Sequence, residues 1–479
     1  HNVAIGYSAL FAQNFTSATN AYNTAVGSGA GAAVTTGTNN TLIGGLAGDA
    51  LADAHFNTAV GYQALSADTE SNYNTAIGYR ALLSSNNTTS TNAYNVAVGA
   101  DAGLSVTTGG SNVLIGANAG DALTASFRNV AVGFGALTSD TLGARTTAIG
   151  YGALQTQNFT SGTYSYNVAL GYNSGVAVTT GTNNTLIGGL AGDSITTAIH
   201  STAVGYDALG RCTTGNYNIA FGGFALGKNT TGTNNTAIGY AALEENTTAS
   251  SNTAVGRYAL VSNTTGTGNV TLGFNAGYTT TTGSSNVYLG QYAGAHNRLN
   301  TTGSNNTLVG ALSDTNSVTS SDANVMGYDV SGAGGYTTLG SGSSDIRAVH
   351  GNITWATVSD ERYKKDIADS TAGLAFINAL QPRTWKYKTL GELPETFTAY
   401  KEGSTEVFKN TQTNHGFIAQ EVKAAIDADD SIKDGFRLWD DRDDGSQEVA
   451  EAALIPVLVK AIQEQSALIT SLTDRIAAL

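Results

Sequence analysis

A serine and two lysines near position 360 are of the residue types that form a nucleophile and its base. Lys364 follows Ser359 by five positions, and Lys365 is its neighbour. A serine hydroxyl becomes a nucleophile when a base removes its proton, and a lysine can do this once burial or a nearby cation lowers its pKa. Asp360 would orient the pair rather than attack. A Ser-Asp pair followed by charges is also typical of a solvated helix cap, so the spacing alone leaves both interpretations open.

Three further segments follow this serine and share a pattern with it. The four segments read SDERYKK from Ser359, GLAFINALQPRTWKYK from Gly373, HGFIAQEV from His415 and LIPVLVKAIQEQSALITSLTDRIAAL from Leu454. In this order and spacing they resemble the intramolecular chaperone domain at the C-terminus of phage tail spikes and tail fibres. That domain is best known from endosialidases and is also present in some animal membrane-bound transcription factors. The resemblance covers residues 355–479.

The resemblance implies both an assembly role and a cleavage reaction. In that family the domain trimerises, templates the β-rich trimer upstream, and then cuts itself off before the serine of the Ser-Asp motif. Carried over to this chain, the scissile bond joins Val358 to Ser359, Lys364 is the preferred base and Lys365 the alternative. Tyr363 stands where the family usually has Leu, which touches packing more than chemistry. The implied activity is a serine-lysine autoprotease that acts once on its own chain, with no turnover enzyme expected.

The last segment predicts a coiled-coil helix over residues 454–479. Its apolar seam follows alternating spacings of three and four, with one polar member: Ile455, Leu458, Ile462, Gln465, Ile469, Leu472, Ile476 and Leu479. Such a seam is typical of a coiled coil, and Pro456 fits a first helical turn. The alternative is a helix packed on its own domain. Alternating Ile and Leu favours two strands, so the expectation of three strands rests on the resemblance.

The composition of the preceding residues indicates a rigid repeat. Residues 1–350 contain 8 Lys/Arg and 15 Asp/Glu, whereas residues 351–479 contain 14 and 21. The whole chain has 59 Gly but only 3 Pro, and 12% of its residues are charged. An ordinary globular enzyme has about twice that charged share, and flexible low-complexity chains are rich in proline. Both classes are therefore disfavoured.

Charge and cysteine content limit the partners. The net charge of -14 disfavours nucleic acid and anionic lipid. No segment comes near the roughly 20 apolar residues of a membrane span, so membrane insertion is not expected. The single Cys212 excludes intrachain disulfides and CxxC metal sites. Six scattered His show no metal spacing, so no metal and no cofactor are expected.

One motif, roughly N-[VT]-A-[IV]-G-x-x-A-[LG], fills the first part of the chain. Its Gly recurs at 6, 27, 44, 61, 78, 99, 116, 133, 150, 171, 188, 205, 222, 239, 256, 273, 290 and 310. Successive Gly positions differ by 17, except for a difference of 21 three times and of 20 once, and the insertions set a larger period of 72. Seventeen residues are too few for two helices, and the residue types are those of strands and turns. The motif predicts a parallel β-solenoid.

The alternation of side chains along a strand and the repeated Asn predict which residues line the inside of this solenoid. Counting from the motif Gly, positions −3 and −1 share one face of the strand, and we expect them to stack inside the coil. Position −2, usually Ala, would then face outward and lie against sister chains. Asn at position −4 in 16 of 18 rungs, all but Thr146 and Ser201, would pair amides between rungs and tolerate a left-handed turn.

The motif also resembles the head repeats of trimeric autotransporter adhesins. NVAIG at residues 2–6 and NVAVG at residues 95–99 match their signature, although their repeat is shorter. The resemblance implies a trimeric parallel β-roll. The expected fold is therefore mainly β: a trimeric parallel β-solenoid of 17-residue rungs over residues 1–313 and a β-rich connector over 314–354. A smaller α+β chaperone domain over 355–453 follows, and the coiled-coil helix over 454–479 ends the chain.

Three insertions are the predicted receptor-binding segments. Each adds four residues before a motif Gly, within residues 11–22, 83–94 and 155–166. We expect them to bulge from the rungs and bring aromatic side chains to the surface beside Asn and Thr, which suits sugar recognition. The residues concerned are Phe15, Tyr94, Phe159, Tyr164 and Tyr166. Plain duplication of a loop is the alternative.

Two further repeated features have a structural and a functional interpretation. Aromatic residues after the motif Gly, such as Tyr62 and Tyr151, would either stack on sugars or form a packing ladder. Asp49, Asp121 and Asp193 recur with the larger period and would either hold Ca²⁺ in a trimer or cap turns.

The leading functional hypothesis is a distal tail fibre of a bacteriophage. Its partners would be two further copies of itself, a bacterial surface glycan or outer-membrane receptor, and an upstream tail-fibre or baseplate protein. It would reside in the virion, be assembled in the host cytoplasm and be extracellular after release. The alternatives are a tail-spike polysaccharide depolymerase, which needs a carboxylate pair, and a bacterial trimeric adhesin, which needs a membrane anchor.

Overall fold

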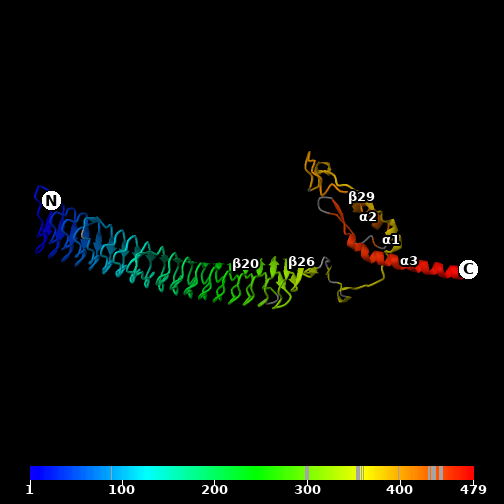
Figure 1. Cartoon of the computed structure of the whole chain (residues 1–479), viewed down its shortest axis with the longest axis horizontal. Coiled ribbons are helices and arrows are strands. Elements are labelled where there is room, and N and C mark those ends of the chain that lie inside the picture. The colour runs from blue at the N-terminus through cyan, green and yellow to red at the C-terminus, as the bar shows by residue number, and fades with distance from the viewer. Residues whose placement is uncertain are drawn as a thin grey trace. The chain divides into compact units, whose positions relative to one another are not determined.

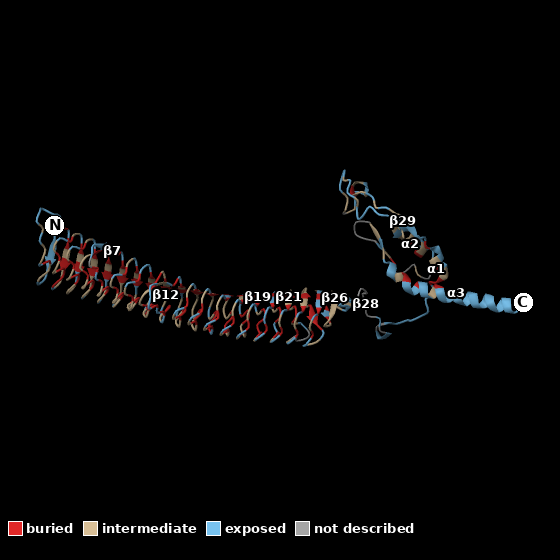
Figure 2. Cartoon of the chain, in the orientation of Figure 1, coloured by how far each residue is buried: buried red, intermediate tan, exposed pale blue. Residues whose placement is uncertain are grey.

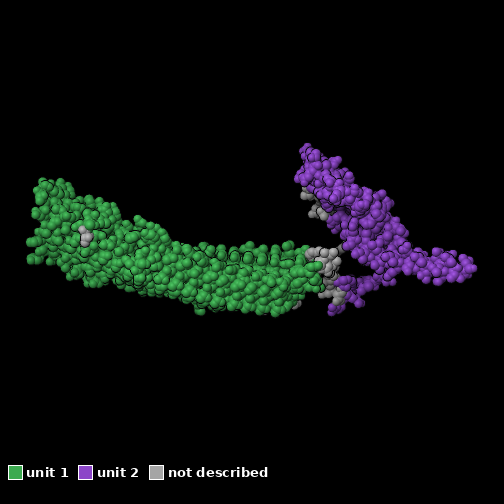
Figure 3. Space-filling view, in the orientation of Figure 1, with its two compact units in different colours: residues 1–358 green, residues 359–479 purple. Residues whose placement is uncertain are grey.

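Short parallel strands, each paired with the next along the chain, build the N-terminal unit of the computed structural model (Figure 1). The structure describes residues 1–87, 89–296, 301–351, 356–357, 359, 361–397, 399–429, 432, 438–441 and 446–479. The chain divides into two compact units, His1–Val358 and Ser359–Leu479 (Figure 3). Each unit is a separate structural body.

The first unit is a parallel β-solenoid, as the sequence predicts. Its stacked strands are β1 (Val3–Ile5), β2 (Thr24–Val26), β3 (Thr41–Ile43), β4 (Thr58–Val60), β6 (Thr75–Ile77), β8 (Val96–Val98), β9 (Val113–Ile115), β10 (Val130–Val132), β12 (Thr147–Ile149), β14 (Val168–Leu170), β15 (Thr185–Ile187), β16 (Thr202–Val204), β17 (Ile219–Phe221), β18 (Thr236–Ile238), β19 (Thr253–Val255), β20 (Val270–Leu272), β21 (Val287–Leu289), β22 (Thr307–Val309), β24 (Asn324–Tyr328) and β26 (Tyr336–Ser341). Equivalent motif positions pair in register, for example Thr24 with Thr41 and Thr41 with Thr58.

The parallel ladder runs past residue 313 before an antiparallel turn ends it. Strands β24 and β26 continue the stack because Gly327 repeats the motif Gly one rung after Gly310. Strand β27 (Ser344–Val349) then pairs antiparallel with β26, and β28 (Ala356–Thr357) pairs antiparallel with β27. The antiparallel strands cover the last parallel edge, which would otherwise present unpaired backbone groups.

The solenoid interior is the reverse of the expectation from parity. Buried residues recur along the solenoid (Figure 2). Position −2 points inward: Ala25, Leu42 and Ala59 are 0% exposed, whereas positions −3 and −1 of the same strands are half-buried or exposed. The alternation of side chains along a strand puts positions −3 and −1 on one face, but it does not determine which face lies inside. The interior receives the side chain at position −2 of each strand, which ranges from Ala to Leu42 and Tyr288, so the choice of face does not follow from side-chain size.

The repeated Asn forms a buried ladder of hydrogen bonds. The Oδ1 of Asn23 accepts the backbone N–H of Asn40 at 2.9 Å, and the Nδ2 of Asn40 donates to the carbonyl of Ala54 at 2.8 Å. The bond between rungs therefore runs from side chain to backbone more than from amide to amide. The left-handed turn lies one residue earlier than expected, at position −5, as at Asn39 with φ 59°. At the exceptional Thr146 and Ser201, the backbone N–H still donates to the Asn of the preceding rung.

The motif Gly is required by a close approach between rungs. Gly44 has φ +132°, and a Cβ on it would lie 2.5 Å from the carbonyl oxygen of Gly61 in the next rung. Both the left-handed backbone and the contact exclude a side chain.

Two of the insertions add short strands. Strand β7 (Thr91–Asn92) pairs with β5 (Ser71–Asn72), and β13 (Thr163–Tyr164) pairs with β11 (Gly143–Ala144). A third small sheet, β23 (Asp314–Thr315) with β25 (Ser331–Gly332), lies near the end of the solenoid.

The second unit is a small α+β domain. Its elements are α1 (Leu374–Ala379), β29 (Arg383–Trp385), β30 (Asn414–Gly416), α2 (Ala419–Asp427), β31 (Trp439–Asp441), β32 (Gln447–Val449) and α3 (Leu454–Ala477), with 3₁₀ turns at Glu361–Tyr363, Leu390–Glu392 and Glu451–Ala453. Phe376, Val422, Ile426, Leu438 and Leu454 form its core. Helix α3 therefore belongs to this core through its first turns.

Candidate functional site

Ser359 and Lys364 lie side by side at the start of the second unit. The Nζ of Lys364 donates a hydrogen bond of 2.8 Å to the Oγ of Ser359. A 3₁₀ turn, Glu361–Tyr363, folds the intervening chain back, and the backbone N–H of Lys364 donates to the carbonyl of Glu361 at 2.9 Å. Within the residues that the structure describes, Lys365 makes no bond to this serine. The two remaining predicted site residues, Val358 and Asp360, lie outside the described residues.

The distance is that of a nucleophile and its general base. Removal of the serine proton by a lysine requires a neutral amine, which burial favours. Both Ser359 and Lys364 are exposed in the single chain. A base role for this lysine therefore requires that something outside the single chain cover the pair.

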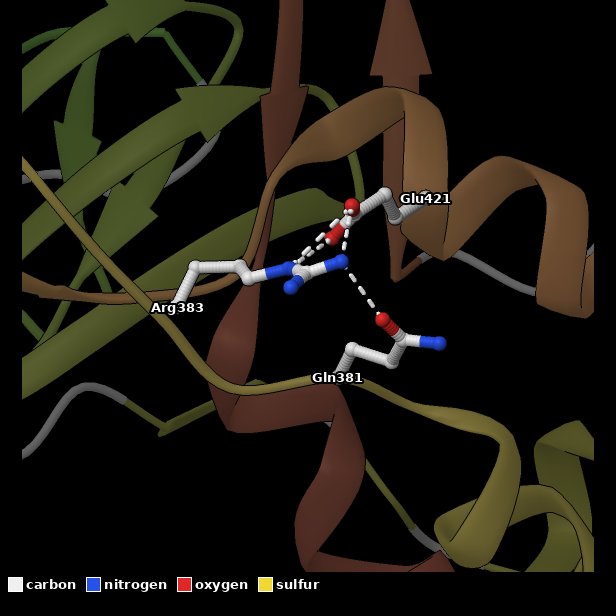
Figure 4. A network of polar contacts seen from close by, with 3 residues as sticks. All are labelled: Gln381, Arg383 and Glu421. Atoms are coloured by element: carbon white, nitrogen blue, oxygen red, sulfur yellow. Dashed lines mark hydrogen bonds and ion pairs between the residues drawn. The ribbon is translucent and has the colours of Figure 1, made fainter.

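An ion pair joins two of the motifs singled out in the sequence. Arg383 on β29 donates to both carboxylate oxygens of Glu421 on α2, at 2.7–3.2 Å, and also to the side chain of Gln381 at 2.6 Å (Figure 4). The hydrogen bonds from Arg383 lower the pKa of the Glu421 carboxyl below its ordinary value. Strand β29 also pairs with β30, which places Thr384 opposite His415. The segments from Gly373 and His415 thus form one structural unit.

A second contact joins α1 to the last helix. The carboxylate of Glu464 on α3 accepts the backbone N–H of Leu374, the first residue of α1, at 2.8 Å. Carboxylates stabilise the exposed N–H groups at a helix start. A Cβ at the preceding Gly373 would lie 2.5 Å from the same carboxylate, so glycine leaves room for this cap.

Helix α3 presents two different faces. Leu454, Val457 and Ala461 are buried against the domain. The apolar members of the predicted seam are instead exposed: Ile455, Leu458, Ile462, Ile469, Leu472, Ile476 and Leu479. One face of the helix thus packs on its own domain, as the alternative interpretation expects, and the coiled coil stays a prediction because the seam has no partner within the described chain.

The helical segment Glu451–Ala477 is, among the described residues, long and apolar enough to cross a membrane by length and composition. The expectation from the sequence that no segment comes near the roughly 20 apolar residues of a membrane span is therefore wrong. Its exposed apolar residues form one stripe, and the charged Lys460 and Glu464 lie on another side of the helix. Such a stripe is typical of a helix that packs against other helices.

The predicted receptor-binding aromatics do not form one group. Tyr94, Tyr164 and Tyr166 are exposed and Phe15 is half-buried. The expectation that Phe159 reaches the surface is wrong, because it is 6% exposed. Its segment folds onto the solenoid instead of bulging: the backbone N–H of Phe159 donates to the buried carboxylate of Asp140 at 3.1 Å.

Surface aromatics form columns along the solenoid. After the motif Gly, Phe134 stacks on Tyr151 and Tyr151 on Tyr172, with ring centroids 5.5 and 5.6 Å apart. At position −5, Phe56 stacks on Tyr73 at 4.9 Å and Tyr73 on Tyr94 at 5.1 Å. Inside a stack the ring faces cover one another and only edges remain for a ligand, which supports the packing interpretation there.

Two of the three repeated Asp residues bond to the following rung, whereas Asp193 accepts the hydroxyl of the neighbouring Ser194. The carboxylate of Asp49 accepts the hydroxyl of Ser66, and that of Asp121 accepts the hydroxyl of Thr138. Burial raises the pKa of both Asp121 and Asp193. Among the described residues there is no group of three His, Cys, Asp or Glu that could hold a metal ion. These contacts support the turn-capping interpretation.

Comparison with known proteins gives one result, for the second unit. Neither the curated proteins nor the solved structures contain a match to this chain. A protein-family model described as "Chaperone of endosialidase" matches residues 359–430. The match begins at Ser359, where the second compact unit also begins. The chain thus consists of a long parallel β-solenoid followed by a chaperone-of-endosialidase domain.

Proposed function

We propose that this protein is the distal part of a bacteriophage tail fibre, in which a trimeric β-solenoid binds a receptor on the bacterial surface. The chaperone-of-endosialidase domain directly after a long solenoid carries the proposal, because in the phage proteins that the chain resembles such a domain follows a β-rich rod and serves its assembly. The receptor is a surface glycan or outer-membrane protein, and the upstream partner is another tail-fibre or baseplate protein. The mature protein is part of the virion.

The outward face of the solenoid strands is the proposed contact between chains. Positions −3 and −1 from β1 to β22 are Thr, Val, Ile, Leu or Phe and contain no charged residue. Ile43, Ile77, Leu170, Phe221 and Leu272 are among those that remain exposed. Large exposed apolar patches mark interaction sites. Another copy of the chain has the same rise per rung and can therefore match this face along its whole length.

The last helix is the proposed nucleus of the trimer. Its exposed seam needs partners, whereas its opposite face holds it on the domain core. Aligning three long solenoids in register has a large entropic cost before any contact forms. A C-terminal trimer lowers that cost by bringing three chains together at one end.

Self-cleavage between Val358 and Ser359 completes the proposed assembly. In the reaction the Ser359 hydroxyl attacks the carbonyl carbon of Val358, and Lys364 accepts the hydroxyl proton. The peptide C–N bond then breaks and its nitrogen, now the N-terminal amine of Ser359, takes up a proton. Water hydrolyses the resulting ester and releases the carboxylate of Val358. Packing of three domains would supply the burial that a neutral Lys364 requires.

Binding of the isolated rod to bacterial cells tests the proposed function. Fluorescent rod, purified after cleavage, is added to a panel of strains, with the chaperone domain alone as the control protein. We expect binding to a restricted set of strains and loss of binding after periodate oxidation of their surface sugars. Absence of binding to any strain, or equal binding of the control, contradicts the proposal. A rise in reducing ends would favour the depolymerase.

A further inference from the structure

Two arginines occupy solenoid positions that are aromatic one 72-residue period earlier and one period later. Position −5 holds Phe56, Tyr73 and Tyr94 on three successive rungs, and these rings stack. One 72-residue period later, the equivalent positions hold Arg128, Arg145 and Tyr166. Strands β10, β12 and β14 that follow them pair in register, so the three side chains also leave neighbouring rungs.

After a further period the aromatic column returns. His200 and Tyr217 occupy the same positions and stack at 5.3 Å. The arginines therefore replace a stacking pair with two like charges on adjacent rungs, and like charges in register destabilise a sheet. A pair of cations on adjacent rungs suits the recognition of an anion.

Neither arginine has an acidic partner among the residues that the structure describes. The solenoid is acidic as a whole, and Arg80 and Lys228 are paired there with Asp101 and Glu245. Arg128 is exposed and Arg145 half-buried. Two arginines on adjacent rungs are thus without an acidic partner among the described residues and can bind a negative charge from outside the chain.

Tyrosines hold one of these guanidinium groups in place. The guanidinium of Arg145 lies 4.2 Å from the ring centroid of Tyr164 and 5.4 Å from that of Tyr166. It also donates a hydrogen bond of 2.5 Å to the Tyr166 hydroxyl. A guanidinium has five N–H donors, so this contact leaves others free. Stacking fixes the plane of the donors, which favours the paired hydrogen bonds that a carboxylate accepts.

The insertion adds exposed aromatic side chains beside the guanidinium of Arg145. Tyr164 and Tyr166 come from the third insertion and are 48% and 47% exposed. Phe127, next to Arg128, is exposed as well. Aromatic surface beside a guanidinium pair suits a sugar ring that bears an acidic group, because the ring packs on the aromatic groups while its carboxylate binds the arginines.

We propose that Arg128, Arg145, Tyr164 and Tyr166 form a binding site for a carboxylate-bearing sugar of a bacterial surface polysaccharide. The proposal deepens the proposed function and rests on it for the source of the sugar. The other two insertions lack the arginines, so the three periods are not equivalent: this one recognises an acidic group and the others do not.

Titration of the trimer with defined oligosaccharides tests the site. The probes are a galacturonate oligomer, a hyaluronan oligomer, the carboxyl-reduced form of each, and inorganic phosphate. We expect one or both acidic oligomers to bind, binding to weaken with added NaCl, and the reduced forms to bind at least tenfold more weakly. Inorganic phosphate should not compete at equal concentration.

The decisive variant is Arg128→Gln with Arg145→Gln. It should weaken binding of the acidic oligomer at least tenfold without changing the elution volume of the trimer. The matched control is Arg257→Gln, because Arg257 also lies over a tyrosine, 4.7 Å from the ring centroid of Tyr258, but in the other aromatic column. The Arg257→Gln variant should bind the acidic oligomer as tightly as the wild type does.

Several results would overturn the site: no binding of either acidic oligomer, equal binding of the reduced forms, competition by phosphate, or unchanged binding by the double variant. Cell adsorption is measured in parallel. If the protein adsorbs to cells but its binding to oligosaccharides does not depend on the arginines, the proposed site is wrong and the proposed function still stands. If the oligosaccharides bind through the arginines but the protein adsorbs to no strain, the proposed function is wrong and the proposed site still stands.

Discussion

The Nζ of Lys364 lies 2.8 Å from the Oγ of Ser359, across one 3₁₀ turn. The turn explains how two residues five apart in sequence come into hydrogen-bonding contact. The same serine begins the second compact unit and the family match. Cleavage of the peptide bond before Ser359 would therefore separate the solenoid from the chaperone domain and leave both units intact.

Substitution of either member of the pair should block cleavage. The wild-type chain of 48.8 kDa should divide into residues 1–358 and 359–479. Ser359→Ala should remain intact because the nucleophile is absent, and Lys364→Ala should cleave roughly 10²–10⁴ times more slowly because a general base is lost. Intact mass spectrometry over time measures both rates.

Lys365→Ala is the matched control for that experiment. It removes a lysine next to the pair and should cleave at the wild-type rate. Slow cleavage by this variant together with fast cleavage by Lys364→Ala would assign the base to the other lysine. A wild-type fragment that begins at any residue but Ser359 would contradict the proposed bond.

Charges in the exposed seam of α3 should prevent assembly. Ile469→Asp with Leu472→Asp puts two carboxylates where apolar residues lie exposed in the single chain. Light scattering should give a monomer or an aggregate in place of a trimer, while the isolated domain keeps its circular dichroism spectrum. Ser471→Asp, on the other side of the helix, should leave the trimer intact. A trimer formed by the double variant argues against a coiled coil.

A charge on the outward strand face should also weaken assembly. Ile238, at position −1 of β18, is 40% exposed. Ile238→Lys should reduce the yield of soluble trimer, because the cation would be buried between chains, whereas Thr231→Lys in an exposed turn should not. Equal trimer yields for both variants would place the contact between chains on another face.

Stability of the solenoid should depend on pH through a buried acid. Burial raises the pKa of Asp140, so the folded state binds this proton more readily than the unfolded state. Its contribution therefore favours folding below the raised pKa and is lost as pH rises from the unfolded value through the folded one. In Asp140→Asn the loss of stability over this range should be smaller than in the wild type, as melting temperatures across a pH series would show. Parallel curves for the two proteins would contradict this.

The solenoid could be predicted from sequence because its signal repeats. The Gly and Asn periodicities predict the length of a rung and the register between rungs, and the structure confirms both. Which face of the strand is inside could not be predicted, since parity is symmetric and side-chain size suggested the wrong face: Ala25, and not Val26, is the core residue. The face that the coil encloses is visible only in three dimensions.

The candidate sites were predictable to different degrees. Ser359 and Lys364 stood out because residue type, spacing and resemblance agreed. The pairing of Arg145 with Tyr164 had no sequence signal of its own, because the two residues belong to different rungs and an insertion separates them. The signal that could have identified the arginines is comparison of the 72-residue periods, in which they replace aromatic residues.

Expression of residues 1–358 with and without the chaperone domain tests the central claim most directly. The rod released by cleavage of the full chain should be a soluble trimer, whereas the same residues expressed alone should aggregate, because nothing aligns the three solenoids. Light scattering on the soluble fraction of each gives the answer. Soluble, trimeric residues 1–358 expressed alone would contradict the account.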